Sequence, residues 1–311
     1  MRLNDASAAA EILVVCGPTA AGKSSLALEL AQREPSTIVS ADSRQVYRGF
    51  DRGTAKPTIE EQSLVPHEGI DVADPATRYS AAAWAVAADR WIEDAIVAGR
   101  RPIVVGGTGL YLRALFEGLF QEPPIDVERR KALEAELAVR STESLREWVA
   151  TLDPPRAHLG RTQLLRSIEI ALLTGRRLSD LHRERPRKPR WRPRYLVVDP
   201  GPLLGERIAR RIDDMLEHGW ADEVQRLTQT IPPDAPAWNS TGYDAVRQLL
   251  AGDLTRAGFH ERVLIDTRQY AKRQRTWFRH QLPDDVTTRV DPSAGDRAAV
   301  VARWSGIGAR A

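Results

Sequence analysis

The sequence predicts an α/β fold: a parallel sheet with a phosphate-binding loop (P-loop), helices on both faces of the sheet, and a helical insertion domain. Three observations support this prediction. The stretch EILVVCGPTAAGKSS joins an apolar run to a glycine-rich loop and a helical pattern. Residues 100–119 repeat that order, and residues 121–194 contain helical patterns without convincing strands. Strands that alternate with helices build parallel sheets covered on both faces.

Composition sets the outer limits. The chain has 311 residues, 42% of them hydrophobic, which is enough for one large domain and a smaller one. A single cysteine, Cys16, excludes a disulfide framework and fits a reducing compartment. The sequence has neither a signal-peptide pattern nor an apolar run of about eighteen residues, so we expect a cytoplasmic protein that does not enter a membrane. The net charge is only +3, and local basic clusters are therefore the places to look for a polyanion partner.

The first loop matches G-x-x-x-x-G-K-[ST] in full, between an expected strand and an expected helix. Glycines let backbone N–H groups curl around phosphate oxygens, and the N-terminus of the following helix adds its dipole. Lys23 adds a point charge, and Ser24 can bind Mg²⁺. An ordinary glycine-rich turn is the alternative. The expected phosphate site consists of Gly17, Pro18, Thr19, Ala20, Ala21, Gly22, Lys23 and Ser24. The motif predicts a bound di- or triphosphate without naming the molecule.

Two further loops follow expected strands. A β-rich run at residues 38–39 passes into Asp-Ser-Arg-Gln at residues 42–45. Ligand groups gather at the carboxyl ends of strands in an open α/β sheet, so we expect Asp42 close to the P-loop. There it can serve as a Mg²⁺ ligand or a general base, and a simple turn or N-cap aspartate is the alternative. A strand at residues 103–105 ends in Gly-Gly-Thr-Gly, where Thr108 offers a hydroxyl near a helix N-terminus.

Basic residues gather in two places. The run RERPRKPRWRPR at residues 183–194 has prolines that keep it out of a regular helix, and a solvated linker is the alternative to a binding role. In residues 267–280 cations recur at helical steps of four, three and four, without an intervening acid. Like charges at that spacing repel, so they are favoured where a polyanion lies against them. This basic stripe consists of Arg268, Lys272, Arg275 and Arg279. We expect the aromatic residues between them to be core anchors.

Together, the motifs GPTAAGKS, DSRQVYRGFDRGTAKP and GGTGLYLRALFEGL closely resemble those of the tRNA dimethylallyltransferases, the bacterial isopentenyl transferases that modify tRNA. The similarity continues through PHEGIDVADP, RSIE, ERIARRIDDMLEHGWADEV, TGYDAV and RQYAKRQRTWFR, and so covers nearly the whole chain from residue 12 to residue 280. It implies that the P-loop holds the diphosphate of dimethylallyl diphosphate, with Mg²⁺, rather than a nucleotide. The amine of the adenine on the 3′ side of the anticodon would attack the allylic carbon, and diphosphate would leave.

The resemblance also implies roles for single residues. Asp42 would act as general base, Thr108 would orient the reacting groups, and Lys23 would stabilise the departing diphosphate. Arg207 and Arg211 would lie toward the diphosphate. Contacts with tRNA, including its flipped adenine, are implied for Asp42, Ser43, Arg44, Gln45, Thr108, Arg130 and Arg166. Gln163 stands where family members usually have an arginine, three residues before Arg166, so a tRNA contact there would be weaker or made differently.

The expected domains are a transferase core, residues 1–120 and 195–311, and a helical insertion, residues 121–194, that contacts tRNA. We expect a monomer whose partners are the tRNA anticodon stem-loop and dimethylallyl diphosphate. The main alternative is a small-molecule kinase that uses ATP, which would have no evident use for the Asp-Ser-Arg-Gln motif or the basic stripe. A second alternative is a non-catalytic RNA-binding module, against which the intact Lys23, Ser24 and Asp42 argue.

Overall fold

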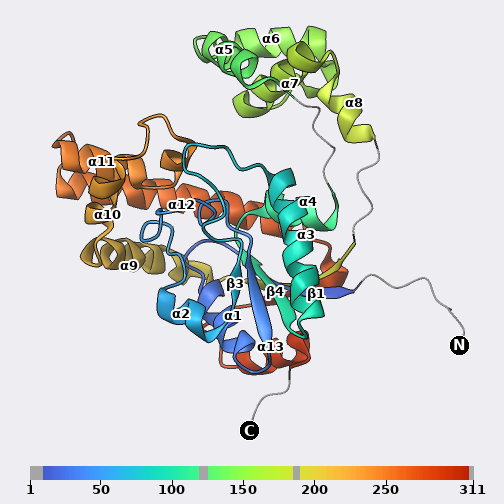
Figure 1. The fold of residues 1–311 in the computed structure, drawn as a ribbon, viewed down its shortest axis with the longest axis vertical. Coiled ribbons are helices and arrows are strands. Elements are labelled where there is room, and N and C mark those ends of the chain that lie inside the picture. Colours follow the sequence, from blue (N-terminus) through green and yellow to red (C-terminus); the bar gives the residue numbers. More distant parts are fainter. Residues whose placement is uncertain (1–9, 119–124, 185–189, 308–311) are drawn as a thin grey trace, which may run out of the picture. The chain divides into compact units, whose positions relative to one another are not determined.

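The computed structural model describes residues 10–118, 125–184 and 190–307, which belong to two compact units (Figure 1). The larger unit joins the chain before residue 117 to the chain from residue 190 onward, and the smaller unit spans residues 117–189. The second boundary lies before the expected residue 195 because residues 192–194 already pair with residues 11–13 as part of a strand. Residues 185–189 of the basic run lie outside the described residues.

The larger unit is built on a six-stranded sheet in the described part of the chain, with strand order β3-β2-β4-β1-β5-β6 and every pairing parallel. The strands are β1 (Glu11–Cys16), β2 (Ser36–Ser40), β3 (His67–Glu68), β4 (Arg101–Gly106), β5 (Arg192–Val198) and β6 (Thr287–Val290). Because β2, β4 and β1 are neighbours and parallel, their carboxyl ends meet at one edge. The loops after these three strands therefore converge.

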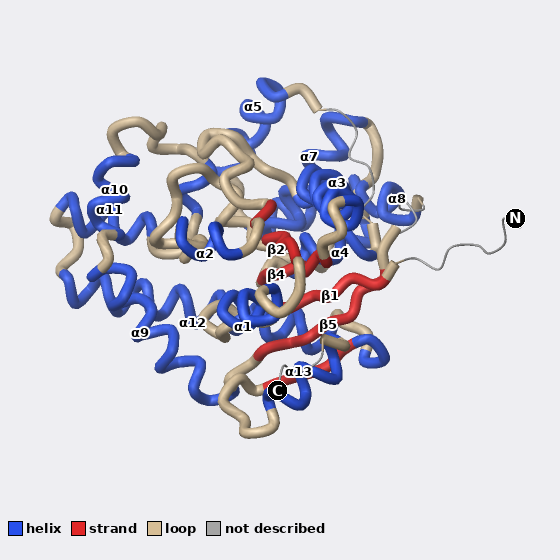
Figure 2. The backbone as a smooth tube through the Cα atoms, turned by 60° about the horizontal axis from the view of Figure 1, so that its bottom comes forward, coloured by secondary structure: helices blue, strands red, loops and turns tan. Residues whose placement is uncertain are grey.

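Helices cover both faces of the sheet (Figure 2). On one face α1 (Lys23–Ala31) and α13 (Arg297–Ser305) bury an apolar layer that includes Leu30 and Trp304 against alternate residues of the central strands. On the other face lie α3 (Ala81–Val97) and α4 (Gly109–Phe116), where Trp84 stacks on Tyr111 and donates its indole N–H to Ser40 O at 3.0 Å. The short helix α2 (Ile59–Leu64) follows a capping box at its N-terminus.

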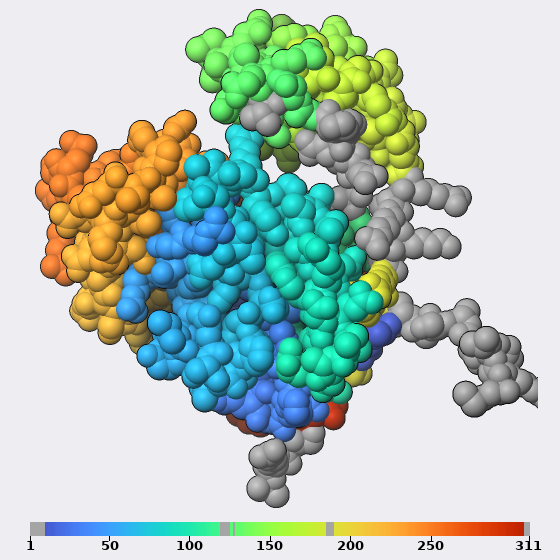
Figure 3. Space-filling model, in the orientation of Figure 1, coloured from blue at the N-terminus to red at the C-terminus, as the bar shows by residue number. Residues whose placement is uncertain are grey.

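The C-terminal helices of this unit are α9 (Leu204–Glu217), α10 (Trp220–Leu227), α11 (Tyr243–Ala251) and α12 (Arg256–His280). In Figures 1 and 3 they lie beside the segment that follows β2. A cluster of edge-to-face and tilted aromatic contacts joins the two parts: Phe50 contacts Trp238 and Tyr243, and Trp220 contacts Tyr243. Such buried aromatic pairs fix the C-terminal helices against the loop of residues 41–58.

The smaller unit is helical, with α5 (Val127–Ala138), α6 (Thr142–Leu152), α7 (Arg161–Thr174) and α8 (Leu178–Arg183). Its core forms around Leu137, Leu145, Val149 and Leu164, each buried. It has its own apolar cluster, as expected for a compact helical domain.

The parallel sheet with helices on both faces confirms the predicted fold class. Strands β3 and β6 were not predicted. No helix of the described residues is long and apolar enough to cross a membrane.

Candidate active site

The P-loop follows β1 and begins at a position that only glycine can occupy. Gly17 has φ +139°, and a Cβ built there would lie 2.2 Å from the backbone oxygen of Val198. Gly22, also with positive φ, caps α1 and supplies no side-chain acceptor to the first turn of the helix. The N–H groups of that turn are therefore available to an anion, as the sequence motif requires.

Lys23 lies folded back over this loop. Its Nζ donates a hydrogen bond to Pro18 O at 2.7 Å. Burial lowers the pKa of Lys23 to about 8, and the positive charge of Arg211 adds to this effect, while Asp42 opposes it. A buried ammonium is stabilised strongly when an anion binds beside it, because the anion replaces the interactions with water that the ammonium has lost.

Gln274 links the P-loop to the loop after β4. Its Oε1 accepts the N–H of Thr19 at 2.8 Å, and its Nε2 donates to Gly107 O at 2.9 Å. The side chain is buried, and a Cβ at Gly107 would come within 2.3 Å of that Nε2. The predicted glycine turn of residues 106–109 thus allows close approach of α12. The sequence interpretation missed Gln274.

The loop after β2 carries Asp42 to the same edge of the sheet. Asp42 accepts the N–H of Arg44 through Oδ1 at 2.8 Å, a local turn that leaves Oδ2 available. Thr108 accepts the N–H of Ser43 at 3.0 Å, and its hydroxyl lies 3.3 Å from the Ser43 hydroxyl. The structure therefore brings Asp42, Ser43 and Thr108 together.

Arg211 and Tyr270 face Asp42 from two C-terminal helices. Burial raises the pKa of Tyr270 to about 12, and the charge of Asp42 contributes, while Arg44 and a hydrogen bond with Thr108 oppose the shift. Burial also lowers the pKa of Arg211, which the nearby Asp42 partly offsets. Asp42 thus lies near a cation and a neutral phenol. Tyr270 was expected only as a core anchor, and this environment makes it a candidate site residue.

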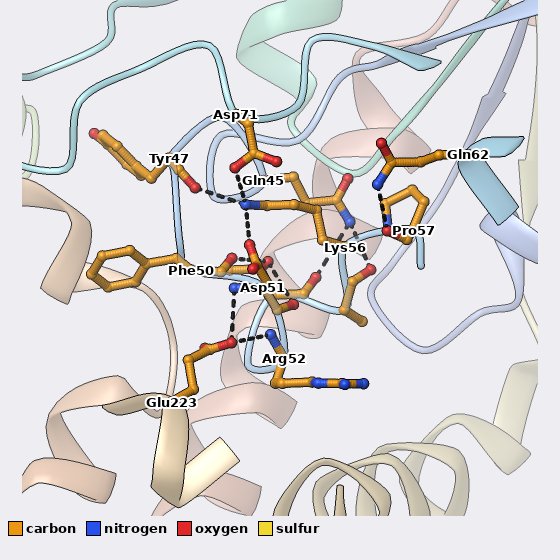
Figure 4. A network of polar contacts seen from close by, with 12 residues as sticks. Gln45, Tyr47, Phe50, Asp51, Arg52, Lys56, Pro57, Gln62, Asp71 and Glu223 are labelled. Carbon is orange, nitrogen blue, oxygen red and sulfur yellow. Dashed lines mark hydrogen bonds and ion pairs between the residues drawn. The ribbon is translucent and has the colours of Figure 1, made fainter. Parts of the chain in front are cut away.

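Gln45 is only 9% exposed and holds the segment after β2 in place (Figure 4). Its Oε1 accepts the hydroxyl of Ser40 at 2.9 Å, and its Nε2 donates to the backbone oxygens of Thr54 at 3.3 Å and Ala55 at 2.9 Å. Both amide protons are used. The predicted contact between Gln45 and an adenine would have to use the remaining lone pair of Oε1.

Two buried charged side chains, Lys56 and Glu223, also hold this segment in place through hydrogen bonds (Figure 4). The Lys56 side chain is 3% exposed and donates to Asp71 Oδ1 at 2.6 Å and to the backbone oxygen of Tyr47 at 2.8 Å. It also pairs with Asp51. From α10, Glu223 accepts the N–H of Arg52 at 2.7 Å. The sequence interpretation gave neither Lys56 nor Glu223 a role.

These loops border a cleft of about 970 Å³. Predicted site residues in its lining are Thr19, Ala20, Ala21, Gly22, Lys23, Ser24, Asp42, Gln45, Arg207 and Arg211. Arg207 lies over the P-loop, with one guanidinium N–H directed at Ala21 O at 3.4 Å. Arg44 lines a smaller adjoining hole together with Asp42. The predicted phosphate-binding residues and the predicted general base, Asp42, therefore share one site.

The site offers few metal ligands of its own. The described residues contain no group of three or more His, Cys, Asp or Glu side chains able to hold a metal ion. Ser24 and Asp42 line the same cleft and offer a hydroxyl and a carboxylate oxygen. Mg²⁺ commonly takes one or two protein ligands and completes its shell with substrate phosphates and water. The two residues fit a Mg²⁺ ion that arrives with a diphosphate.

Only three of the four side chains in the basic stripe on α12 are exposed and available to a partner. Arg268, Lys272 and Arg279 are exposed. Arg275 instead pairs with Asp199 in the loop after β5 and donates to Gly201 O. The phosphate contact predicted for Arg275 would have to compete with that ion pair.

The predicted tRNA residues of the smaller unit form a group of their own. Glu169, buried in α7, pairs with Arg130 at 2.6 Å and with Arg166 at 2.7 Å. Gln163 is exposed one turn before Arg166. A shared carboxylate holds the two guanidinium groups side by side and offsets part of their charge.

Comparisons with known proteins show which family the chain belongs to. The chain matches the IPP transferase family over residues 45–281 and the isopentenyl transferase family over residues 10–65. It is 42% identical to the tRNA dimethylallyltransferase of a Synechococcus species, over 87% of this chain and 77% of that protein.

Solved structures show the same similarity. The full-length tRNA isopentenylpyrophosphate transferase of Bacillus halodurans is 31% identical, with a TM-score of 0.67 and coverage of 96% of this chain and 95% of that one. A eukaryotic dimethylallyltransferase acting on tRNA is 25% identical, with a TM-score of 0.76 and coverage of 96% and 79%. The resemblance stated from the sequence motifs is confirmed. This chain belongs to the IPP transferase family.

Proposed function

We propose that this protein transfers the dimethylallyl group of dimethylallyl diphosphate to the exocyclic amine of an adenine in tRNA, and that this adenine lies on the 3′ side of the anticodon. The relatives are named for dimethylallyl transfer to tRNA. The observation that carries the proposal is the cleft in which a complete P-loop with Lys23 lies beside the carboxylate of Asp42. A phosphate site next to a general base suits a reaction in which an amine displaces a diphosphate.

The diphosphate would bind at the P-loop. The N–H groups at the start of α1, the ammonium of Lys23 and the guanidinium groups of Arg207 and Arg211 all surround the cleft. Charge builds on the leaving diphosphate as the carbon–oxygen bond breaks, and these groups are in place to stabilise it. Mg²⁺ that arrives with the diphosphate would be held at the Ser24 hydroxyl and would supply further charge stabilisation to the phosphate oxygens, which leaves Asp42 free to act as the general base.

The adenine amine would enter from the side of Asp42. Its nitrogen forms a bond to the allylic carbon, the bond between that carbon and the diphosphate oxygen breaks, and the amine loses one proton. Oδ2 of Asp42 is the acceptor for that proton, because Oδ1 already accepts the N–H of Arg44. Thr108 fixes the backbone next to Asp42 through Ser43.

The tRNA would lie against basic surface in both units. Arg268, Lys272 and Arg279 present exposed cations on α12. Arg130 and Arg166, with Gln163 beside them, form a second group on the insertion. The enzyme would act as a monomer in the cytoplasm, where tRNA is modified.

The test is a donor comparison with purified protein and unmodified tRNA. Labelled dimethylallyl diphosphate should place its label in the tRNA, whereas γ-labelled ATP should label neither the tRNA nor a small molecule. Transfer from ATP without transfer of the prenyl label would replace the proposal with a P-loop kinase. Asp42 and the basic stripe favour the transferase.

A further inference from the structure

Gln274 bridges the two loops that continue from the neighbouring strands β1 and β4. These strands pair as far as Cys16 and Gly106, after which the P-loop continues from β1 and the glycine turn continues from β4. A primary amide has the same kind of donor and acceptor as a peptide group. The amide of Gln274 accepts the N–H of Thr19 at 2.8 Å and donates to Gly107 O at 2.9 Å. A side chain therefore extends the connection between the two strands.

The glycine turn in its turn holds both neighbours of Asp42. The residue after the bridged glycine, Thr108, donates its backbone N–H to Ala41 O at 3.2 Å. The Thr108 hydroxyl accepts the N–H of Ser43 at 3.0 Å. Hydrogen bonds thus run from the P-loop through Gln274 and the glycine turn to the backbone on either side of Asp42.

The bridging amide has little room to move. Gln274 is 6% exposed, and a Cβ at Gly107 would lie 2.3 Å from its Nε2. The next residue of α12 is also fixed, because Arg275 pairs with Asp199 and donates to Gly201 O. The helix and the two loops therefore hold the amide at one position.

We propose that Gln274 is a positioning residue that sets the distance between the leaving diphosphate and the general base Asp42. The P-loop would fix the diphosphate, and the loop after β2 would fix the acceptor of the amine proton, so the separation of these loops decides whether the reacting groups meet. A displacement of about 1 Å can cost about 10²-fold in rate. Gln274 acts through the two loops that it joins. This inference rests on the proposed transferase function.

The experiment replaces the amide with an apolar side chain of similar length, in Gln274→Met. At saturating substrates the kcat for prenyl transfer should fall about 10²-fold, while the Kd values for inorganic diphosphate and for tRNA stay near those of the wild type. Val301→Ala is the control for lost stability. Val301 is buried in the layer that covers the sheet and belongs to neither loop, so its truncation destabilises the protein without breaking the bridge. Its kcat should stay at the wild-type value.

A second variant tests the hydrogen bonds rather than the packing. In Gln274→Glu a protonated carboxyl group can still accept from Thr19 and donate to Gly107, whereas the ionised carboxylate has no proton to donate. The ratio of its kcat to that of the wild type should therefore rise as the pH falls from about 8 to about 5.5. Because the ratio is taken at each pH, the titration of groups common to both proteins, such as Lys23, cancels.

A wild-type kcat in Gln274→Met, or a ratio in Gln274→Glu that does not change with pH, would overturn the inference. A loss confined to the Kd for diphosphate or for tRNA would also overturn it, because Gln274 would then be a binding residue. An equal fall of kcat in Val301→Ala would reduce the effect to lost stability. Absence of any prenyl transfer by the wild-type protein would instead refute the proposed function itself.

Discussion

The lowered pKa of Lys23 makes the use of the donor depend on pH in a way that can be calculated. With a pKa of about 8, about nine tenths of Lys23 is charged at pH 7 and about one tenth at pH 9. If only the charged form holds the diphosphate, kcat/KM for dimethylallyl diphosphate falls about tenfold between these two pH values. Because the pKa of Lys23 is lowered to about 8, the ammonium loses its proton between pH 7 and pH 9, and donor use falls as pH rises.

The measurement is the initial rate at saturating tRNA and low donor, taken from pH 6 to pH 9.5. Because kcat/KM reports groups of the free enzyme, the basic limb should fall with an apparent pKa of about 8. The residual activity of Lys23→Arg is the control, since a guanidinium remains charged throughout this range. Its profile should be flat on the basic side.

A binding experiment checks the same proton directly. Inorganic diphosphate should raise the pKa of Lys23 when it binds, so binding at pH 8 should take up about half a proton more in the wild-type protein than in Lys23→Arg, where the proton exchange of the diphosphate itself is the same. Calorimetry in buffers of different ionisation enthalpy measures this uptake. A flat rate profile in the wild-type protein, or the same fall in Lys23→Arg, would refute the role of the Lys23 charge in donor binding.

Three further outcomes are expected. Asp42→Asn should lower turnover by about 10²- to 10⁴-fold with tRNA affinity retained, and single-turnover rates near wild type would reassign the base. Gln274→Leu should destabilise the protein in urea unfolding by about 1–3 kcal/mol for each of the two backbone groups left without a partner, and unchanged stability would mean that the bridge is negligible. Lys272→Ala with Arg279→Ala should flatten the log–log salt dependence of tRNA binding by about 0.7 to 0.9 per lost contact. Arg256→Ala, at the other end of α12, is the control for the last variant, and an equal change there would remove the stripe from the tRNA surface.

Strands bounded by glycine loops could be predicted from the sequence because their apolar runs are buried on both faces. β1 and β4 are examples: nearly every residue in them is buried. β3 has two half-buried residues, and β6 reads Thr-Thr-Arg-Val at the edge of the sheet. Edge strands need only backbone pairing with one neighbour, and so they leave no apolar run to recognise.

The P-loop and Asp42 could be predicted because their chemistry is local in sequence. Gln274 could not, because its two partners lie 255 and 167 residues away. A weaker signal was present: Tyr270 and Gln274 are spaced by four residues on the same helix face as the buried Phe278. Polar residues on an apolar helix face indicate a polar contact inside the protein.

The basic stripe shows the opposite limit. Charge spacing correctly placed exposed cations on α12, but it could not anticipate that Asp199, from a distant loop, would pair with Arg275. An ion pair between elements depends on the tertiary fold, and a helical pattern carries no information about it.

The most direct test of the proposed function is one turnover with labelled dimethylallyl diphosphate and a single purified tRNA, followed by nuclease digestion and mass analysis of the nucleosides. The proposed function predicts one prenylated adenosine, at the position on the 3′ side of the anticodon, together with one equivalent of released diphosphate. Lys23→Ala should give neither product while still binding the tRNA. A prenyl group on any other nucleoside, or diphosphate released without a modified adenosine, would contradict the proposed function.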